Sequence, residues 1–163
     1  METSVPCGAL STGSAWMLAV LLILGSPFPM FAALGDTPHS VAVDQERMKA
    51  SVKIVQAGAY AIYEMTCPNG TVVKEYVSGS AGRVFGVSWR GPFIPDLKQL
   101  LGTYFHQYAA AAKAQRDSHV ERRPLNIQEP ELVVQTAGHM RAFSGRAYNP
   151  GALPAGSNAD DIK

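Results

Sequence analysis

The sequence predicts an α+β domain, in which an antiparallel β-meander packs against one long amphipathic helix and short strands follow near the C-terminus. Three observations support this class. Alternating apolar and polar runs occur between residues 51 and 89, and Asn69-Gly70 separates two of them, which is a strong short-range signal for a hairpin. Apolar residues then recur at helical spacing between residues 97 and 112. A helix with one apolar face needs a partner, and the meander offers one.

The strand signals of the meander lie at residues 51–56, 59–67, 71–78 and 83–89. These runs are rich in β-branched and aromatic residues, as strands usually are. Both residues of an Asn-Gly hairpin turn take positive φ, so we expect Asn69 and Gly70 to form a two-residue turn. Gly86 interrupts the last run and indicates a bulge or a close approach.

One amphipathic helix is expected over about residues 96–115. Pro92 and Pro95 end the preceding strand, and Asp96 occupies the position of an N-cap. The face of this helix is formed by apolar residues, namely Leu97, Leu100, Leu101, Tyr104, Phe105, Tyr108 and Ala112. Gly102 within the helix costs about 1 kcal/mol relative to Ala, which indicates a close contact with the sheet. Upstream, residues 39–50 fit either a short helix or an irregular lead-in.

The remainder of the chain predicts a loop, short strands and a tail. Residues 116–131 are polar and interrupted by Pro, whereas 132–136, 139–143 and 146–148 have the composition of short strands. Residues 149–163 are rich in Pro, Gly, Ala and Asp, which is typical of a flexible tail. We therefore expect a single domain at 34–148.

Residues 1–33 are expected to be a removable signal peptide. The run from Ala15 to Leu24 contains about ten apolar residues, which is shorter than the roughly 20 residues that span a bilayer. Gly25, Pro27 and Pro29 follow, and cleavage is expected after Ala32 or Ala33. The first 14 residues contain no Lys or Arg, so an uncleaved inner-membrane anchor at 15–34 is an alternative, and a buried N-terminal helix of a cytoplasmic protein is another. Cys7 lacks the context of a lipoprotein signal.

Charge and cysteine content exclude several classes. The chain has a net charge of +1, and residues 34–163 alone carry +2, without the cluster of Lys and Arg that nucleic-acid binding requires. No nucleic-acid partner is therefore expected, and membrane contact is expected only through an uncleaved signal segment. After cleavage Cys67 would be the one cysteine left, so an internal disulfide is excluded. Cys67 is expected to pack as a small apolar residue, and a reactive thiol is the alternative.

Several short patterns resemble catalytic or metal sites without matching them. Gly86–Gly91 has one residue too many for a nucleophile elbow, and Asp117, Ser118 and His119 are adjacent, whereas triads are assembled by folding. The four histidines (His39, His106, His119 and His139) lack the local spacing of zinc ligands. No carboxylates are paired at close spacing. The sequence therefore predicts no catalytic residue, no metal and no cofactor.

Two surface features remain as binding candidates. Arg116, Arg122 and Arg123, near Lys113, form a small basic loop that is either solvated or binds an acidic partner. Trp89 and Phe93 flank Arg90 on a connection that Gly91, Pro92 and Pro95 stiffen, and a stiff connection loses less entropy on binding. We predict partner binding at Trp89, Arg90 and Phe93, although the aromatic residues also suit the core between sheet and helix.

Two blocks carry a family resemblance: GTVVKEYVSGSAGRVFGVSWRGPFIPDLKQLLGTYF, from Gly70, and LVVQTAGHMRAFSGRAYNPGALPAG, from Leu132. Together they resemble the bacterial family DUF2844, small exported proteins of unknown function, over about residues 33–162. The resemblance implies export and a bacterial source, and it implies no catalytic residues. Cys67 is a departure from the family pattern.

These observations predict an exported, periplasmic or extracellular protein that acts as a non-enzymatic binding or accessory module of the bacterial envelope. Its partner would be an unknown envelope protein or ligand. A hydrolase-like enzyme with an unrecognised site is one alternative, and a structural subunit of a surface or secretion assembly is another. A deep polar pocket would favour the enzyme, an exposed apolar patch the binding module, and an open sheet edge the subunit.

Overall fold

A computed structural model describes residues 34–118 and 124–163. The predicted signal peptide at 1–33, the alternative anchor at 15–34 up to Ala33, and Cys7 lie outside the described residues. The same holds for His119, Arg122 and Arg123, so the predicted basic loop is described only at Lys113 and Arg116.

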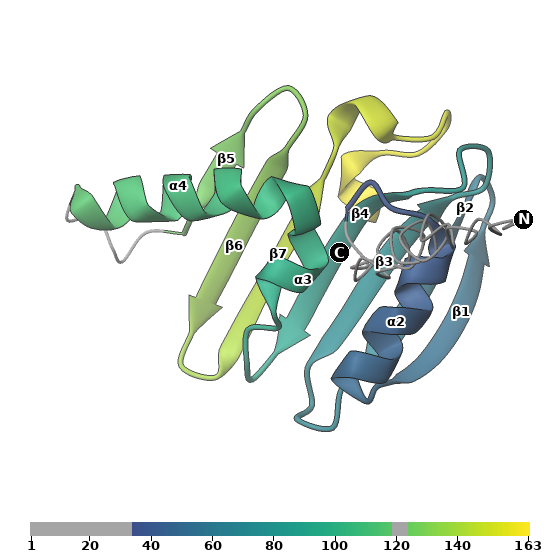
Figure 1. The fold of residues 1–163 in the computed structure, drawn as a ribbon, viewed down its shortest axis with the longest axis horizontal. Helices are drawn as coiled ribbons and strands as arrows, with labels where there is room; N and C mark the ends of the chain where they lie inside the picture. Colours follow the sequence, from purple (N-terminus) through teal and green to yellow (C-terminus); the bar gives the residue numbers. More distant parts are fainter. Residues whose placement is uncertain (1–33, 119–123) are drawn as a thin grey trace, which may run out of the picture.

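The domain is built on one antiparallel sheet of seven strands in the order β1-β2-β3-β4-β7-β6-β5 (Figure 1). Strands that are consecutive in the chain pair with each other except β4 and β5, and β7 joins the two halves by pairing with both β4 and β6. The predicted α+β class with a meander, a long helical segment and short C-terminal strands is confirmed. The strands are β1 (Ser51–Ala57), β2 (Tyr60–Thr66), β3 (Val72–Ser78), β4 (Val84–Gly91), β5 (Asn126–Gln128), β6 (Val133–His139) and β7 (Ala142–Tyr148).

The hairpin between β2 and β3 is confirmed, but its turn has three residues instead of two. The Gly70 N–H donates to the Cys67 carbonyl at 3.0 Å, and the Cys67 N–H donates to the Thr71 carbonyl at 2.8 Å. Gly70 has φ +83°, whereas Asn69 does not have positive φ. Pro68 precedes Asn69 and favours an ordinary turn, which the left-handed glycine then completes as a bulge. The Asn69 side chain instead accepts the Thr71 N–H at 2.9 Å.

The helices lie together on one face of the sheet (Figure 1). Residues 39–50, for which the sequence left two possibilities, contribute most of helix α2 (Pro38–Met48), which covers the β1–β3 side. The predicted helix at 96–115 is helical from residue 97 to 117 but is broken at Gly102, which has φ +51°. It consists of α3 (Leu97–Leu101), the 3-10 turn η1 (Gly102–Tyr104) and α4 (Phe105–Asp117). The break allows α4 to leave the direction of α3 and run across β6 toward β5.

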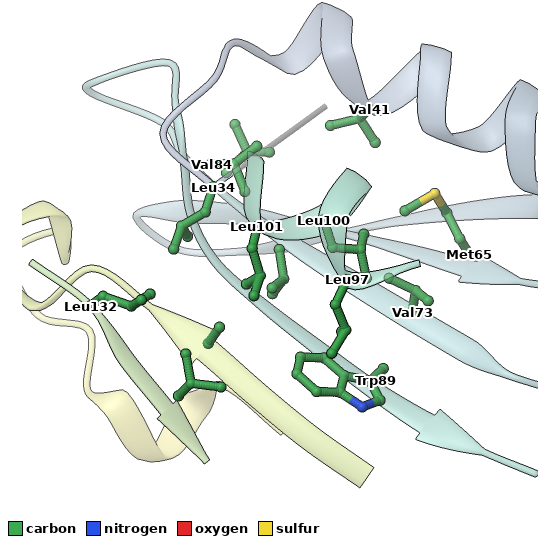
Figure 2. Packing of buried hydrophobic residues seen from close by; sticks show 14 of the residues in the cluster. Leu34, Val41, Met65, Val73, Val84, Trp89, Leu97, Leu100, Leu101 and Leu132 are labelled. Carbon is green, nitrogen blue, oxygen red and sulfur yellow. The ribbon is translucent and has the colours of Figure 1, made fainter. Parts of the chain in front are cut away.

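The main core lies between α2, α3 and the sheet (Figure 2). Leu100 and Leu101 from α3 are 1% and 0% exposed and meet Val73 and Trp89 from the strands. Asp96 caps α3, because its carboxylate accepts the N–H groups of Lys98 and Gln99. The three leucines of α3 are buried, whereas no residue of α4 is, so the predicted core-facing surface is fully realised only in the first part of the helical segment.

The C-terminal segment covers part of the opposite face of the sheet. Ile162 is fully buried and packs with Tyr76 and Phe85 in a second, smaller core. The Tyr76 hydroxyl accepts the Lys163 N–H at 3.0 Å and donates to the Lys163 carbonyl at 2.9 Å. Composition predicts a flexible tail at 149–163; the structure instead packs this segment against the sheet, because its apolar residues find a place that composition does not reveal. Short 3-10 turns, η2 (Pro150–Ala152) and η3 (Ala159–Asp161), shape it.

Within the described ranges, no helix is long and apolar enough to cross a membrane.

Candidate functional site

A hollow of about 510 Å³ lies beside the helices, where β4, β6 and β7 pass under α3 and α4. It is within the range of ligand pockets, which is roughly 300–1,000 Å³. Its lining is mainly apolar and includes Trp89, Leu97, Tyr108, Phe143, Ile94 and Met140. Thr136, His139 and Ser144 add polar groups. A mostly apolar hollow with a few polar groups is the usual composition of a binding site.

Large apolar side chains are exposed around this hollow. Ile94 is 54% exposed and Met140 is 85% exposed, and both line it. Phe93, next to Ile94, is 48% exposed, and its carbonyl accepts the Thr71 hydroxyl at 3.1 Å, which fixes this connection to the hairpin. We call Phe93, Ile94 and Met140 the apolar rim.

Trp89 belongs to the core and also reaches the hollow. Its side chain is 3% exposed and lies below Leu97 (Figure 2). It packs over Gly145, its cross-strand partner on β7, where a Cβ atom would overlap the indole ring. The glycine is therefore required to seat the tryptophan, and the indole forms a rigid part of the wall.

Two arginines border a second, smaller hollow of about 290 Å³, at the end of β4 and the start of β7. Arg90 is exposed near the end of β4, and Arg141 lies in the turn between β6 and β7. Met140 and Arg141 form that two-residue turn with φ +26° and +64°, a conformation that non-glycine residues adopt rarely. In the part of the chain that the structure describes, neither arginine has an ion-pair or hydrogen-bond partner.

A separate polar cluster is buried between α2, β3 and α3. Asp44 and Glu75 are 0% and 1% exposed, and Gln99 from α3 donates its side-chain N–H to one Asp44 oxygen. The other Asp44 oxygen and both Glu75 oxygens have no partner outside this pair. Two carboxylates cannot donate to each other unless one of them is protonated, so a shared proton is the arrangement that satisfies the pair.

Burial dominates the electrostatics of this pair. It raises the pKa of Asp44 from 3.8 to about 6, against the lowering effects of the hydrogen bonds from Gln99 and Glu75 and of the Arg47 charge. Burial, followed by the proximity of Asp44, raises the pKa of Glu75 well above its ordinary 4.5. Both shifts favour a proton held on this pair at neutral pH.

The Cys67 thiol is buried in the main core and lies 3.9 Å from the Met48 sulfur. Burial raises the pKa of this thiol, which lowers the fraction of the reactive thiolate. Cys67 packs as the small apolar residue that its context predicts.

A comparison with known protein families identifies the family of this chain. A family model described as "Protein of unknown function (DUF2844)" matches residues 30–162. The chain belongs to the DUF2844 family. No curated protein and no solved structure matches it.

The structure separates the three residues predicted to bind a partner in this DUF2844 domain. Trp89 and Arg90 alternate on β4, so the indole points into the core beneath the helices and Arg90 is exposed on the opposite face. Phe93 is exposed beyond the end of β4. Arg90 and Phe93 are thus available to a partner, whereas Trp89 contributes through the wall of the hollow.

The remaining sequence candidates stay apart. Among residues 34–118 and 124–163, no group of three or more His, Cys, Asp or Glu side chains is placed to hold a metal ion. Gly86, Ser88 and Gly91 lie within β4 rather than at a strand-to-helix turn. Tyr104 packs against the main core, and its hydroxyl accepts the side-chain N–H of Asn149 at 3.1 Å.

Sequence reasoning missed the Asp44–Glu75 pair and the contribution of β6 and β7 to the hollow. The two carboxyl groups are 31 positions apart, so spacing along the chain could not pair them. The available signal was Glu75 itself, a charged residue on the same side of β3 as Val73 and Val77. A charge in that alternating pattern indicates either a buried partner or an exposed edge.

Proposed function

We propose that this DUF2844 protein is a non-enzymatic binding module of the bacterial envelope. The observation that carries the proposal is the apolar rim beside the 510 Å³ hollow. Exposed apolar side chains that gather around a concavity are typical of surfaces that bind a partner or ligand. The rim is supported by ordered backbone, since the Thr71 hydroxyl holds the carbonyl of Phe93.

The envelope part of the proposal depends on export. The apolar run from Ala15 to Leu24 indicates export. Leu34, next to the expected cleavage site, is 2% exposed, and its N–H donates to the Leu100 carbonyl at 3.1 Å.

The strongest argument for an enzyme would be the Asp44–Glu75 pair, because a carboxyl group with a raised pKa can act as a general acid. A general acid must come within hydrogen-bond reach of its substrate. Both side chains are covered by α2 and α3, and neither lines the hollows described above. The location of the pair therefore favours a role in holding α2 and α3 on the sheet.

The test uses N-phenyl-1-naphthylamine, an uncharged apolar dye whose fluorescence rises in apolar surroundings. We expect the full-length protein to bind the dye, and Ile94→Ser combined with Met140→Ser to weaken binding about tenfold, because both side chains line the hollow. Ile54→Ser on β1 is the matched control, since Ile54 is as exposed as Ile94, at 54% each. Equal effects of the rim and control substitutions would contradict the proposal, as would an absence of dye binding.

A second candidate function is a structural subunit that joins others by strand addition. The outer edge of β1 has no paired strand in the described sheet, and Ile54 and Val55 on it are 54% and 38% exposed. Open edges accept additional strands, although Lys53 in the middle of β1 opposes this. Assembly through β1 predicts oligomers in solution that Val55→Pro abolishes, measured by light scattering; a monomer at high concentration would contradict it.

A further inference from the structure

The two hollows at the end of the sheet are adjacent and differ in character. Phe143 and Ser144 line both of them. On the helix side the larger hollow is mainly apolar, and on the other side the smaller hollow is bordered by Arg90 and Arg141. No Asp or Glu is among the described residues that line either one. An apolar hollow and a positively charged hollow therefore lie on the two faces of the same end of the sheet, with Phe143 and Ser144 between them.

The strand pairing and the β6–β7 turn place the two arginines at this end of the sheet. Arg90 lies opposite Ser144 in the β4–β7 pairing, which places a hydroxyl group beside the guanidinium. Arg141 is held at the start of β7 by a turn with two consecutive positive φ angles. Gly91 and Pro92 form the remaining wall. A conformation that is unfavourable for non-glycine residues is often retained where it positions a functional side chain.

Arg90 and Arg141 have no ion-pair or hydrogen-bond partner among the described residues, unlike a nearby arginine on the same face. Arg146 donates to the Gln135 side chain and to the Ala159 carbonyl, both at 2.8 Å, and lies 3.6 Å from Asp160. A third hollow, of about 480 Å³, also contains Arg90, but its one acidic residue, Glu64, already pairs with Lys74 at 3.6 Å. Arg90 and Arg141 are therefore available to an external anion, and guanidinium groups bind carboxylate and phosphate in a bidentate manner.

We infer that this end of the sheet binds an anionic amphiphile, a molecule with an apolar chain and a carboxylate or phosphate head. The ligand passes around the end of the sheet beside Phe143: its chain lies in the larger hollow on the helix face, and its head lies between Arg90 and Arg141 on the other face. This inference rests on the proposed binding function and names its ligand class. The charge complementarity selects an anionic head over a neutral one.

The inference is tested by displacing N-phenyl-1-naphthylamine from the full-length protein with decanoate or with 1-decanol, which differ only in the head group. We expect decanoate to compete at a concentration at least about tenfold lower than 1-decanol, because hydrogen bonds to charged groups are the stronger ones. Arg90→Gln with Arg141→Gln should remove this advantage and leave competition by 1-decanol unchanged. Raising the salt concentration should weaken decanoate selectively.

The control is Lys53→Gln with Lys98→Gln, which removes the same charge from exposed positions elsewhere. Equal competition by decanoate and 1-decanol, or an equal loss in the control pair, would overturn the anionic site while leaving dye binding and the proposed function intact. The first of these results would assign the hollow to a ligand that is recognised through its apolar part alone. Failure to bind the dye at all would overturn the proposed function itself.

Vesicles distinguish the two sources of an anionic head. Binding to phosphatidylglycerol vesicles but not to phosphatidylcholine vesicles, with loss in the Arg90→Gln, Arg141→Gln variant, would identify a membrane phospholipid. Arginine-dependent competition by decanoate without arginine-dependent vesicle binding would identify a free fatty acid. Either result supports the site, and arginine-independent binding in both assays overturns it.

Discussion

Replacing Glu75 by Gln should change how the stability of the domain depends on pH. In the native state burial keeps the pKa of Asp44 at about 6 instead of 3.8 and the pKa of Glu75 well above 4.5. A group whose pKa is raised by folding stabilises the native state below its unfolded pKa, and this contribution disappears as the pH rises through its folded pKa. The pair therefore favours the folded state at pH 4 and progressively less at higher pH.

The magnitude follows from the Asp44 shift. A change from 3.8 to about 6, at about 1.4 kcal/mol for each pKa unit, corresponds to about 3 kcal/mol in full, of which about 2 kcal/mol is lost between pH 4 and pH 7 because pH 4 already lies above 3.8. The raised pKa of Glu75 adds a further loss that begins above its ordinary value of 4.5. In Glu75→Gln an amide N–H replaces the carboxyl proton as donor to Asp44, and Gln99 remains the second donor. Two amide donors stabilise the Asp44 carboxylate, so its pKa should return toward the ordinary range.

The assay is urea denaturation followed by circular dichroism from pH 4 to pH 9. We expect the free energy of unfolding of the variant, relative to the parent, to rise by at least about 2 kcal/mol between pH 4 and pH 7. Glu64→Gln is the control, because Glu64 is half-buried on the other face and pairs with Lys74. Carboxyl groups elsewhere titrate in every protein compared and cancel in the difference. A difference that stays within about 1 kcal/mol across this range would refute the buried shared proton.

Three further predictions concern the fold and its processing. Leu101→Ala should lower the free energy of unfolding by roughly 2–5 kcal/mol, since Leu101 is fully buried; a loss under about 1 kcal/mol in the same denaturation assay would show that α3 does not pack as described. Gly70→Val should cost at least about 1 kcal/mol, because Gly70 has φ +83°, and an unchanged thermal midpoint would contradict the turn geometry. Intact-mass analysis of exported protein should find a start near Ala33 or Leu34, whereas a full-length mass in the membrane fraction would identify an uncleaved anchor.

Local patterns were sufficient to predict most secondary structure in this chain. The alternation in β3, the Asn69-Gly70 signal and the Asp96 cap each depend on residues close in sequence, and each acts locally in the structure. Where prediction differed, a neighbour in the chain changed the outcome. Pro68 converted the expected two-residue turn into a three-residue one, and Gly102 broke the long helix with its positive φ.

The candidate site was harder to predict because its parts come together through long-range pairing. Phe143 and Met140 border the same hollow as Trp89 only because β7 pairs with β4, which are about 50 residues apart. Composition marked Trp89, Arg90 and Phe93 as a group, but strand alternation sends the first two side chains to opposite faces. The sequence could suggest the right end of the sheet without resolving which side chains share a surface.

The C-terminal segment has a consequence for the timing of folding. Tyr76 and Phe85 complete their apolar surroundings only when Ile162 reaches them, and the hydroxyl of Tyr76 is satisfied by the backbone of Lys163, 87 residues further along. The second layer of the domain cannot close while a ribosome still holds these residues. Contacts of such separation form late and slowly, because the intervening chain must first be ordered. Until residues 162 and 163 have left the ribosome, Tyr76 and Phe85 therefore stay partly uncovered on the outer face of the sheet.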